Sequence, residues 1–358
     1  MPHEFTPPTG PSQALDFWIA NIQDESYPAS EHSLQDELVL TERTGYRRHV
    51  LYGLNLFVNA YFQQFPMLLG YRQVPPTSSS ALPPLLNAMD EGLKFARYDT
   101  AELTVSRVER DAGQGTLGFD VTVLNKGGHN LPSGVGFRRL FLEVVVLAQD
   151  GGLLWASGRT DGLGQLLVGT TDTPLPGEYL SLTDEQPYQP HHQIITQGDQ
   201  VQIYEELNTD SAGRFTSSFI HRYNDVKDNR LRPTGWRWDD DYAELIRPYG
   251  VGDDPDYGGE QLSGADTTRY EITLPPEAYA QAATVRVRLY SQATPPHYLQ
   301  QRFDLGAMGP YSRDSKRLYY MAGHLDTSGT TNLRLPDTLP DTYIEDWRLL
   351  VTGVELGL

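Results

Sequence analysis

Residues 140–147 read LFLEVVVL, and the chain then passes through Gln149-Asp150-Gly151-Gly152 into LLWA at 153–156. An apolar run of this length, rich in β-branched valine, is typical of a buried strand. Asp and Gly adopt the backbone conformations that tight turns need, so the segment between the two runs predicts a hairpin. Two neighbouring antiparallel strands are therefore expected here, one of them in the protein core.

Alternation of apolar and polar residues extends this sheet pattern along much of the chain. The runs that show it are 103–105, 117–123, 200–207 and 284–290, and 347–356 is expected to add a closing strand. Residues 208–280 are rich in Asp and Gly clusters and predict loops. The pattern predicts a mainly β protein, an antiparallel β-sandwich over 101–305 with long loops, on which a C-terminal extension, 306–358, closes.

The N-terminal third has a different character. Residues 1–43 are rich in Pro, Ser, Gln and Glu without a sustained period, which predicts an extended arm. Residues 44–100 predict a helical segment, because apolar residues recur at helical spacing over 44–69 and again over 83–98. Pro66 is expected to end or kink the first of these helices.

Composition excludes several kinds of chemistry. The 358 residues include no cysteine, so the chain holds no disulfide, thiolate zinc site, iron–sulfur cluster, cysteine nucleophile or C-x-x-C-H haem attachment motif. The net charge of −19 disfavours binding to nucleic acid and to anionic membranes. The sequence contains no run of 18 apolar residues, so it predicts no transmembrane helix. The first residues, MPHEF, do not form a signal peptide.

Two histidines stand out as candidate ligands. His49 follows Arg47 and Arg48 at the head of an apolar segment, and His129 lies in a Gly-rich loop, NKGGHNLPSG at 125–134, that precedes Arg138 and Arg139. Imidazole is the usual protein ligand of haem iron and of many divalent metals. The alternatives are a surface histidine among basic neighbours for the first and a turn histidine bonded to backbone for the second.

Three further polar segments suggest weaker hypotheses. Clustered carboxylates at Asp253, Asp254 and Asp256, with Gly residues on either side, suggest a Ca²⁺ site, with a solvated acidic loop as the alternative. Residues 227–230, KDNR, predict a loop held by its own ion pair. The adjacent pair at 191–192 is interpreted as two surface histidines. No nucleophile motif or coherent acid–base set is present, which favours a non-enzymatic role.

Several phrases together resemble the C-terminal, non-haem region of bacterial multihaem c-type cytochromes. The first is VTVLNKGGHNLPSG at 121–134, followed by Arg138, Arg139 and LFLEVVV at 140–146. The others are ASG at 156–158, QIYE at 202–205, KDNRLRPTG at 227–235 and LYSQATPPHYLQQRF at 289–303. Residues 48–55, RHVLYGLN, resemble a shorter signature, H-x-x-x-G-x-N, that supplies a distal histidine in such cytochromes. The chain departs from the family in lacking every C-x-x-C-H motif.

The resemblance implies an electron-transfer accessory domain. Its haem c groups are attached to another segment or subunit, His49 and His129 are sixth ligands, and the four arginines beside them pair with haem propionates. The Met-Pro-His start suggests a chain that begins just after the last haem motif of a longer cytochrome. A periplasmic or extracellular location follows. The alternative is a haem-free β-sandwich that recognises carbohydrate or protein, since the chain has 21 Tyr and 5 Trp residues.

Overall fold

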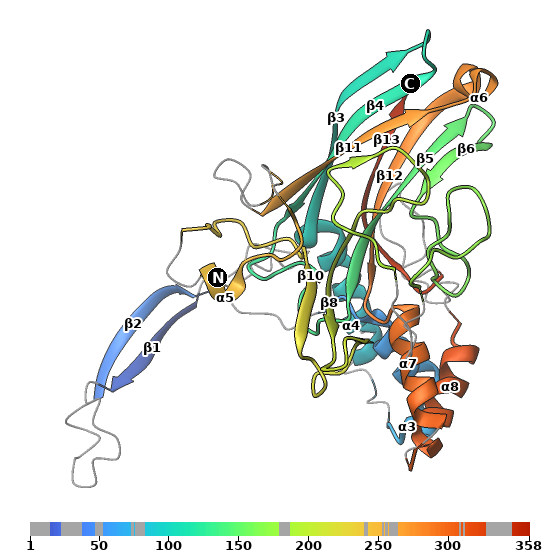
Figure 1. Ribbon diagram of the computed structural model, residues 1–358. Coiled ribbons are helices and arrows are strands. Elements are labelled where there is room, and N and C mark those ends of the chain that lie inside the picture. The colour runs from blue at the N-terminus through green and yellow to red at the C-terminus, as the bar shows by residue number, and fades with distance from the viewer. Residues whose placement is uncertain are drawn as a thin grey trace. The chain divides into compact units, whose positions relative to one another are not determined.

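A computed structural model defines the fold (Figure 1). The structure describes residues 15–22, 38–46, 53–72, 75, 83–178, 187–239, 243–252, 254, 257, 264–307, 309–310, 312–326 and 346–358. The chain divides into two compact units, residues 1–51 and residues 52–358. In the first unit β1 (Leu15–Ile22) pairs antiparallel with β2 (Leu38–Tyr46). The sequence predicted only an extended arm over most of this stretch, although LDFWIANI and LVLTERTGY contain many residues of high strand propensity.

The second unit is a β-sandwich, as predicted. The smaller sheet has the order β3 (Ala101–Asp111), β4 (Thr116–Asn125), β11 (Ala265–Thr273), β7 (Ile194–Ile195), with only β7 parallel to its neighbour. The larger sheet has the order β10 (Asn224–Asp228), β8 (Ile203–Thr209), β5 (Arg139–Ala148), β12 (Ala282–Gln292), β13 (Leu349–Gly357). In addition, β6 (Leu153–Ser157) pairs with β5, and β9 (Phe215–Thr216) pairs with β8. The hairpin expected after residue 147 is thus confirmed.

The main core lies between the two sheets. Alternate residues of β5 and β12 face it, together with alternate residues of β4 and β11; among them are Leu140, Leu142, Val144, Val146, Val285, Val287, Leu289, Phe119, Val121 and Tyr270. The other face of the larger sheet is partly covered by the segment 158–178, which adds Leu166 and Leu175 to a smaller apolar cluster. The period of two seen in the sequence therefore reflects burial of one face of each strand.

Helices form a second core at one end of the sandwich (Figure 1). They are α2 (Leu56–Gln64), α3 (Pro66–Leu69), α4 (Pro84–Phe95), η1 (Ala96–Thr100), α7 (Pro296–Ala307) and α8 (Ser312–His324), while α5 (Ala243–Ile246) and α6 (Pro276–Gln281) are short connections. Phe57 stacks on Trp347 with ring centroids 5.2 Å apart. Pro66 does end α2 and begins α3, because proline fits the first turn of a helix but not its interior. No helix among the described residues has the length and apolarity to cross a membrane.

Candidate functional site

The loop between β4 and β5 presents His129 to solvent on a fixed backbone. Asn125, the last residue of β4, is 1% exposed, and its amide nitrogen donates to the carbonyl oxygens of His129 (2.7 Å), Leu231 (3.1 Å) and Arg232 (3.2 Å). Its side-chain oxygen accepts from the backbone N–H of Gly127 at 2.8 Å. Four hydrogen bonds from one buried amide therefore hold the loop to the sandwich, while the His129 side chain is exposed.

Arg138 lies at the far end of the same loop with little compensation for its charge. It is half-buried, and Nη1 donates to the carbonyl oxygen of Ser133 at 3.0 Å. Its buried Nε has no hydrogen-bond partner, and among the described residues no carboxylate oxygen lies within 4.0 Å of the guanidinium. Burial lowers the pKa of Arg138. A partly desolvated cation of this kind attracts an anion.

Arg139, the next residue, is engaged inside the protein. Its two terminal nitrogens donate to Glu178 at 2.8 and 2.7 Å, and its Nε donates to Gln292 at 2.7 Å. The two charged side chains are 3% and 5% exposed. Arg139 thus anchors the 158–178 segment to the sheet, and only Arg138 of this pair is placed to meet an external anion.

The side chain of His191 is buried, which corrects its interpretation as a surface histidine. Its side chain is 1% exposed, and Nε2 lies 2.8 Å from Asp254 Oδ2 and 3.6 Å from Asp266 Oδ1. Nδ1 lies 3.1 Å from the amide nitrogens of both Gln202 and Asn229. Asp254 and Asp266 lie 63 and 75 positions further along the chain, so the local sequence does not reveal this environment.

The backbone fixes the tautomer of His191. The side-chain oxygens of Gln202 and Asn229 accept from the backbone N–H groups of His192 and Glu205, both at 2.9 Å, so neither amide can be flipped. Both amide nitrogens therefore donate to Nδ1 of His191. The neutral imidazole carries its proton on Nε2 and donates it to Asp254.

This hydrogen-bond pattern does not suit a metal ion. Ligand atoms of His191, Asp254 and Asp266 lie within 4.8 Å of one another, which is close enough for shared coordination. Coordination through Nε2 would move the proton to Nδ1, where it would face two N–H donors. Metal-bound histidines normally donate that proton to an acceptor. The Ca²⁺ hypothesis stays a prediction, because Asp253 and Asp256 lie outside the described residues.

The segment around Lys227 is held by ion pairs, as predicted for the KDNR sequence, but Lys227 and Asp228 belong to strand β10 and not to a loop. Arg230 donates to both oxygens of Asp228, at 2.8 and 2.7 Å. Lys227 is 1% exposed and bonds Glu205 at 3.1 Å and the carbonyl oxygen of Ile203 at 2.9 Å. Burial lowers the pKa of Lys227, whereas the Glu205 carboxylate opposes that shift. The sequence did not indicate that this lysine is internal.

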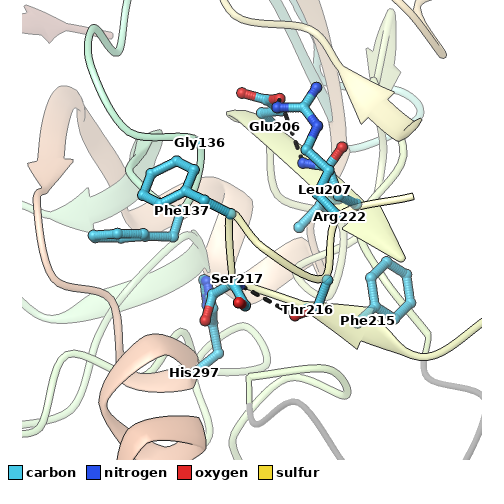
Figure 2. Close-up of a pocket in the computed structure, with 12 residues that line it drawn as sticks. Gly136, Phe137, Glu206, Leu207, Phe215, Thr216, Ser217, Arg222 and His297 are labelled. Carbon is cyan, nitrogen blue, oxygen red and sulfur yellow. Dashed lines mark hydrogen bonds and ion pairs between the residues drawn. The ribbon is translucent and has the colours of Figure 1, made fainter. Parts of the chain in front are cut away.

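A small pocket lies beside the β4–β5 loop. His297 from α7, Phe215 from β9 and Phe137 from the loop line it (Figure 2). Its volume of about 20 Å³ suits a single water molecule, not an organic substrate. Phe137 stacks on Tyr298 with ring centroids 3.7 Å apart, which attaches the loop to α7. Burial, with Arg139 nearby, lowers the pKa of His297 to about 3.

Acidification is expected to destabilise the fold through this histidine. The unfolded chain binds a proton near pH 6.5 and the folded chain only near pH 3, so the unfolded state gains protons as the pH falls between these values. Stability should drop by about 2 kcal/mol from pH 6.5 to 5, to be checked by urea unfolding at several pH values. His297→Gln should flatten this dependence and His324→Gln, an exposed control, should not. Equal slopes for the two variants would contradict the assignment.

The remaining candidates from the sequence, Arg47, Arg48 and His49, lie outside the described residues, so their predicted roles stay predictions.

No protein-family model and no curated protein sequence matches the chain.

A solved structure to which the chain is similar is the penta-heme cytochrome c552 from Thermochromatium tepidum. The TM-score is 0.36 and the identity 13%, over 74% of this chain and 41% of that chain. The chain therefore spans less than half of the length of that cytochrome. This is a weak structural similarity to a multihaem cytochrome c.

Proposed function

We propose that this chain is a haem-free accessory domain of a multihaem c-type cytochrome system, in which His129 is the sixth ligand of a haem c carried by another segment or subunit. The observation that supports this proposal is the exposed imidazole of His129 on a loop fixed by the four hydrogen bonds of Asn125. The proposal includes a periplasmic or extracellular location and the second predicted ligand, His49.

The loop has the properties that such a ligand needs. A neutral imidazole donates a nitrogen lone pair to low-spin iron. Because the backbone is already ordered, little conformational entropy is lost when the imidazole binds. Arg138 adds a guanidinium without a carboxylate partner among the described residues, and a haem propionate would supply the missing negative charge.

The test is a visible-absorption titration of the purified chain into a haem c peptide that has one axial histidine and an open sixth position. The proposal predicts conversion to a low-spin, bis-histidine spectrum. His129→Ala should weaken the transition about tenfold or more, the loss expected when one coordinate bond worth more than 1.4 kcal/mol is removed. His221→Ala is the matched control, because His221 is also exposed.

Two outcomes would overturn the proposal. One is an unchanged haem spectrum at saturating concentrations of the chain. The other is an equal loss in the His129 and His221 variants, which would mean that binding is not specific to the loop. A separate His49→Ala variant tests whether the N-terminal histidine contributes a second ligand.

A haem-free binding module is the second candidate function, and one observation favours it. Phe219, Ile220 and Tyr223, between β9 and β10, are 61%, 90% and 71% exposed. Trp236 offers no flat platform for a sugar, because it is 5% exposed and packs edge-on against Trp238. This candidate would be favoured by an unchanged haem spectrum together with a loss, in Ile220→Ser, of binding to a carbohydrate or protein partner.

A further inference from the structure

The outer face of the larger sheet carries a groove lined by four arginines. Val285 and Val287 of β12 face the core, so Arg286 and Arg288, which alternate with them, face outward. Arg348, directly before β13, and Arg159, from the segment after β6, complete the set. The groove has a volume of about 480 Å³. It shares no residue with the β4–β5 loop, where the haem ligand is proposed.

The carboxylate inside the groove is already paired. Glu143 of β5 contacts Arg348 at 2.6 Å and Arg286 at 3.5 Å. The guanidinium of Arg288 forms one hydrogen bond among the described residues, to the hydroxyl of Tyr290 at 3.4 Å, and no carboxylate of these residues lies within 4.0 Å of it. The residues that line the groove include four arginines and one glutamate, a formal charge of +3, although the whole chain carries −19.

Three carboxylates that do not line the groove lie close to its arginines and reduce this charge. Asp346 lies 3.8 Å from Arg348, and Asp172, which is 98% exposed, lies 4.0 Å from Arg159. Glu355 is the cross-strand neighbour of Arg286, but it is exposed and forms no ion pair with it. None of the three contacts Arg288.

The arginine side chains are held in place by the surrounding residues. The guanidinium of Arg348 lies 4.1 Å above the ring of Tyr290, a cation–π contact. The stem of Arg288 passes over Gly353, where a Cβ atom would come within 3.2 Å of Arg288 Cγ. The Nε of Arg286 is buried and has no hydrogen-bond acceptor. Ordered guanidinium groups with unused donors match the oxygens of phosphate or carboxylate.

We infer that this groove binds a small oxyanion of two or more negative charges, a phosphate compound or a polycarboxylate. Its volume falls in the range of small-molecule sites, roughly 300–1,000 Å³. A nucleic acid is disfavoured because its extended phosphate chain would also meet the acidic remainder of the surface.

Isothermal titration calorimetry on the full chain at low salt tests the inference, with pyrophosphate, inorganic phosphate and citrate as separate probes. Saturable binding of pyrophosphate or phosphate alone identifies the phosphate class, and binding of citrate alone identifies the polycarboxylate class. Arg288→Gln should weaken the favoured probe about tenfold, and higher salt should weaken it further. Arg313→Gln, an exposed arginine of α8, is the matched control.

The inference is overturned if none of the three probes binds wild type, or if Arg288→Gln and Arg313→Gln have the same affinity for the probe as wild type. Near-UV circular dichroism of each variant checks that the fold is retained. If Arg288→Gln proves unfolded, Arg159→Gln, at the groove's loop side, replaces it with the same expected loss. The haem titration does not bear on any of these outcomes.

Discussion

Arg139→Met is expected to lower the free energy of unfolding by about 3–5 kcal/mol, the cost of leaving one member of a buried ion pair uncompensated. The substitution removes both hydrogen bonds to Glu178 and the bond to Gln292 and leaves the buried Glu178 carboxylate without its cation. The Glu178 carboxylate would keep one hydrogen bond, from the backbone N–H of Leu166. A single hydrogen bond does not compensate for a buried, unpaired charge. Urea unfolding followed by tryptophan fluorescence measures the change.

A double variant separates the lost pair from the lost packing. Arg139→Met with Glu178→Leu removes both charges, and most of the lost stability should return. Arg317→Met, which breaks an exposed pair with Asp314 at 3.8 Å, is the control and should change stability by less than about 0.5 kcal/mol. A double variant no more stable than Arg139→Met alone would show that shape, and not charge, dominates at this site.

The strands were largely predictable because their burial leaves a local signature. Residues 117–123 and 284–290 alternate in the sequence and lie in β4 and β12. β11 has the same alternation, TRYEIT, but it lies within a region whose Asp and Gly clusters predicted loops. Helices α7 and α8 were not predicted either, because α7 buries polar residues such as His297 and Gln301 and α8 buries only Met321.

The polar interior was not predictable, since its partners are distant in sequence. The Arg139–Glu178 pair joins residues 39 positions apart, and His191 contacts Asp266 across 75 positions. A histidine beside another histidine has no local pattern that distinguishes a buried network from a solvated surface. The loop that joins β4 and β5 was predicted correctly, because two strong strand patterns flank a Gly-rich segment.

Asn125→Ala is expected to have the second-largest effect, a loss of about 2–4 kcal/mol, because it leaves buried polar groups without partners. Three carbonyl oxygens and the N–H of Gly127 lose their hydrogen bonds to this side chain at once. Asn125→Asp should be worse although its shape is nearly the same, because a carboxylate oxygen would then face the three carbonyl oxygens. Urea unfolding ranks the two variants.

A buried asparagine with fewer bonds provides the control. Asn208 is 7% exposed and donates only to Glu206, at 3.4 Å, so Asn208→Ala should cost clearly less than Asn125→Ala. Equal costs would mean that the loss reflects general burial of an amide and not the support of the β4–β5 loop.

The same variant links stability to the proposed ligand. At a temperature where Asn125→Ala is still folded, the His129 imidazole remains exposed but its backbone is no longer held, so ordering the loop must accompany binding. The haem c peptide should then bind more weakly to Asn125→Ala than to Asn208→Ala, by more than the difference in their folded fractions explains. Equal affinity in the two folded variants would show that the loop needs no prior order, and the hydrogen bonds of Asn125 would then no longer support His129 as the ligand.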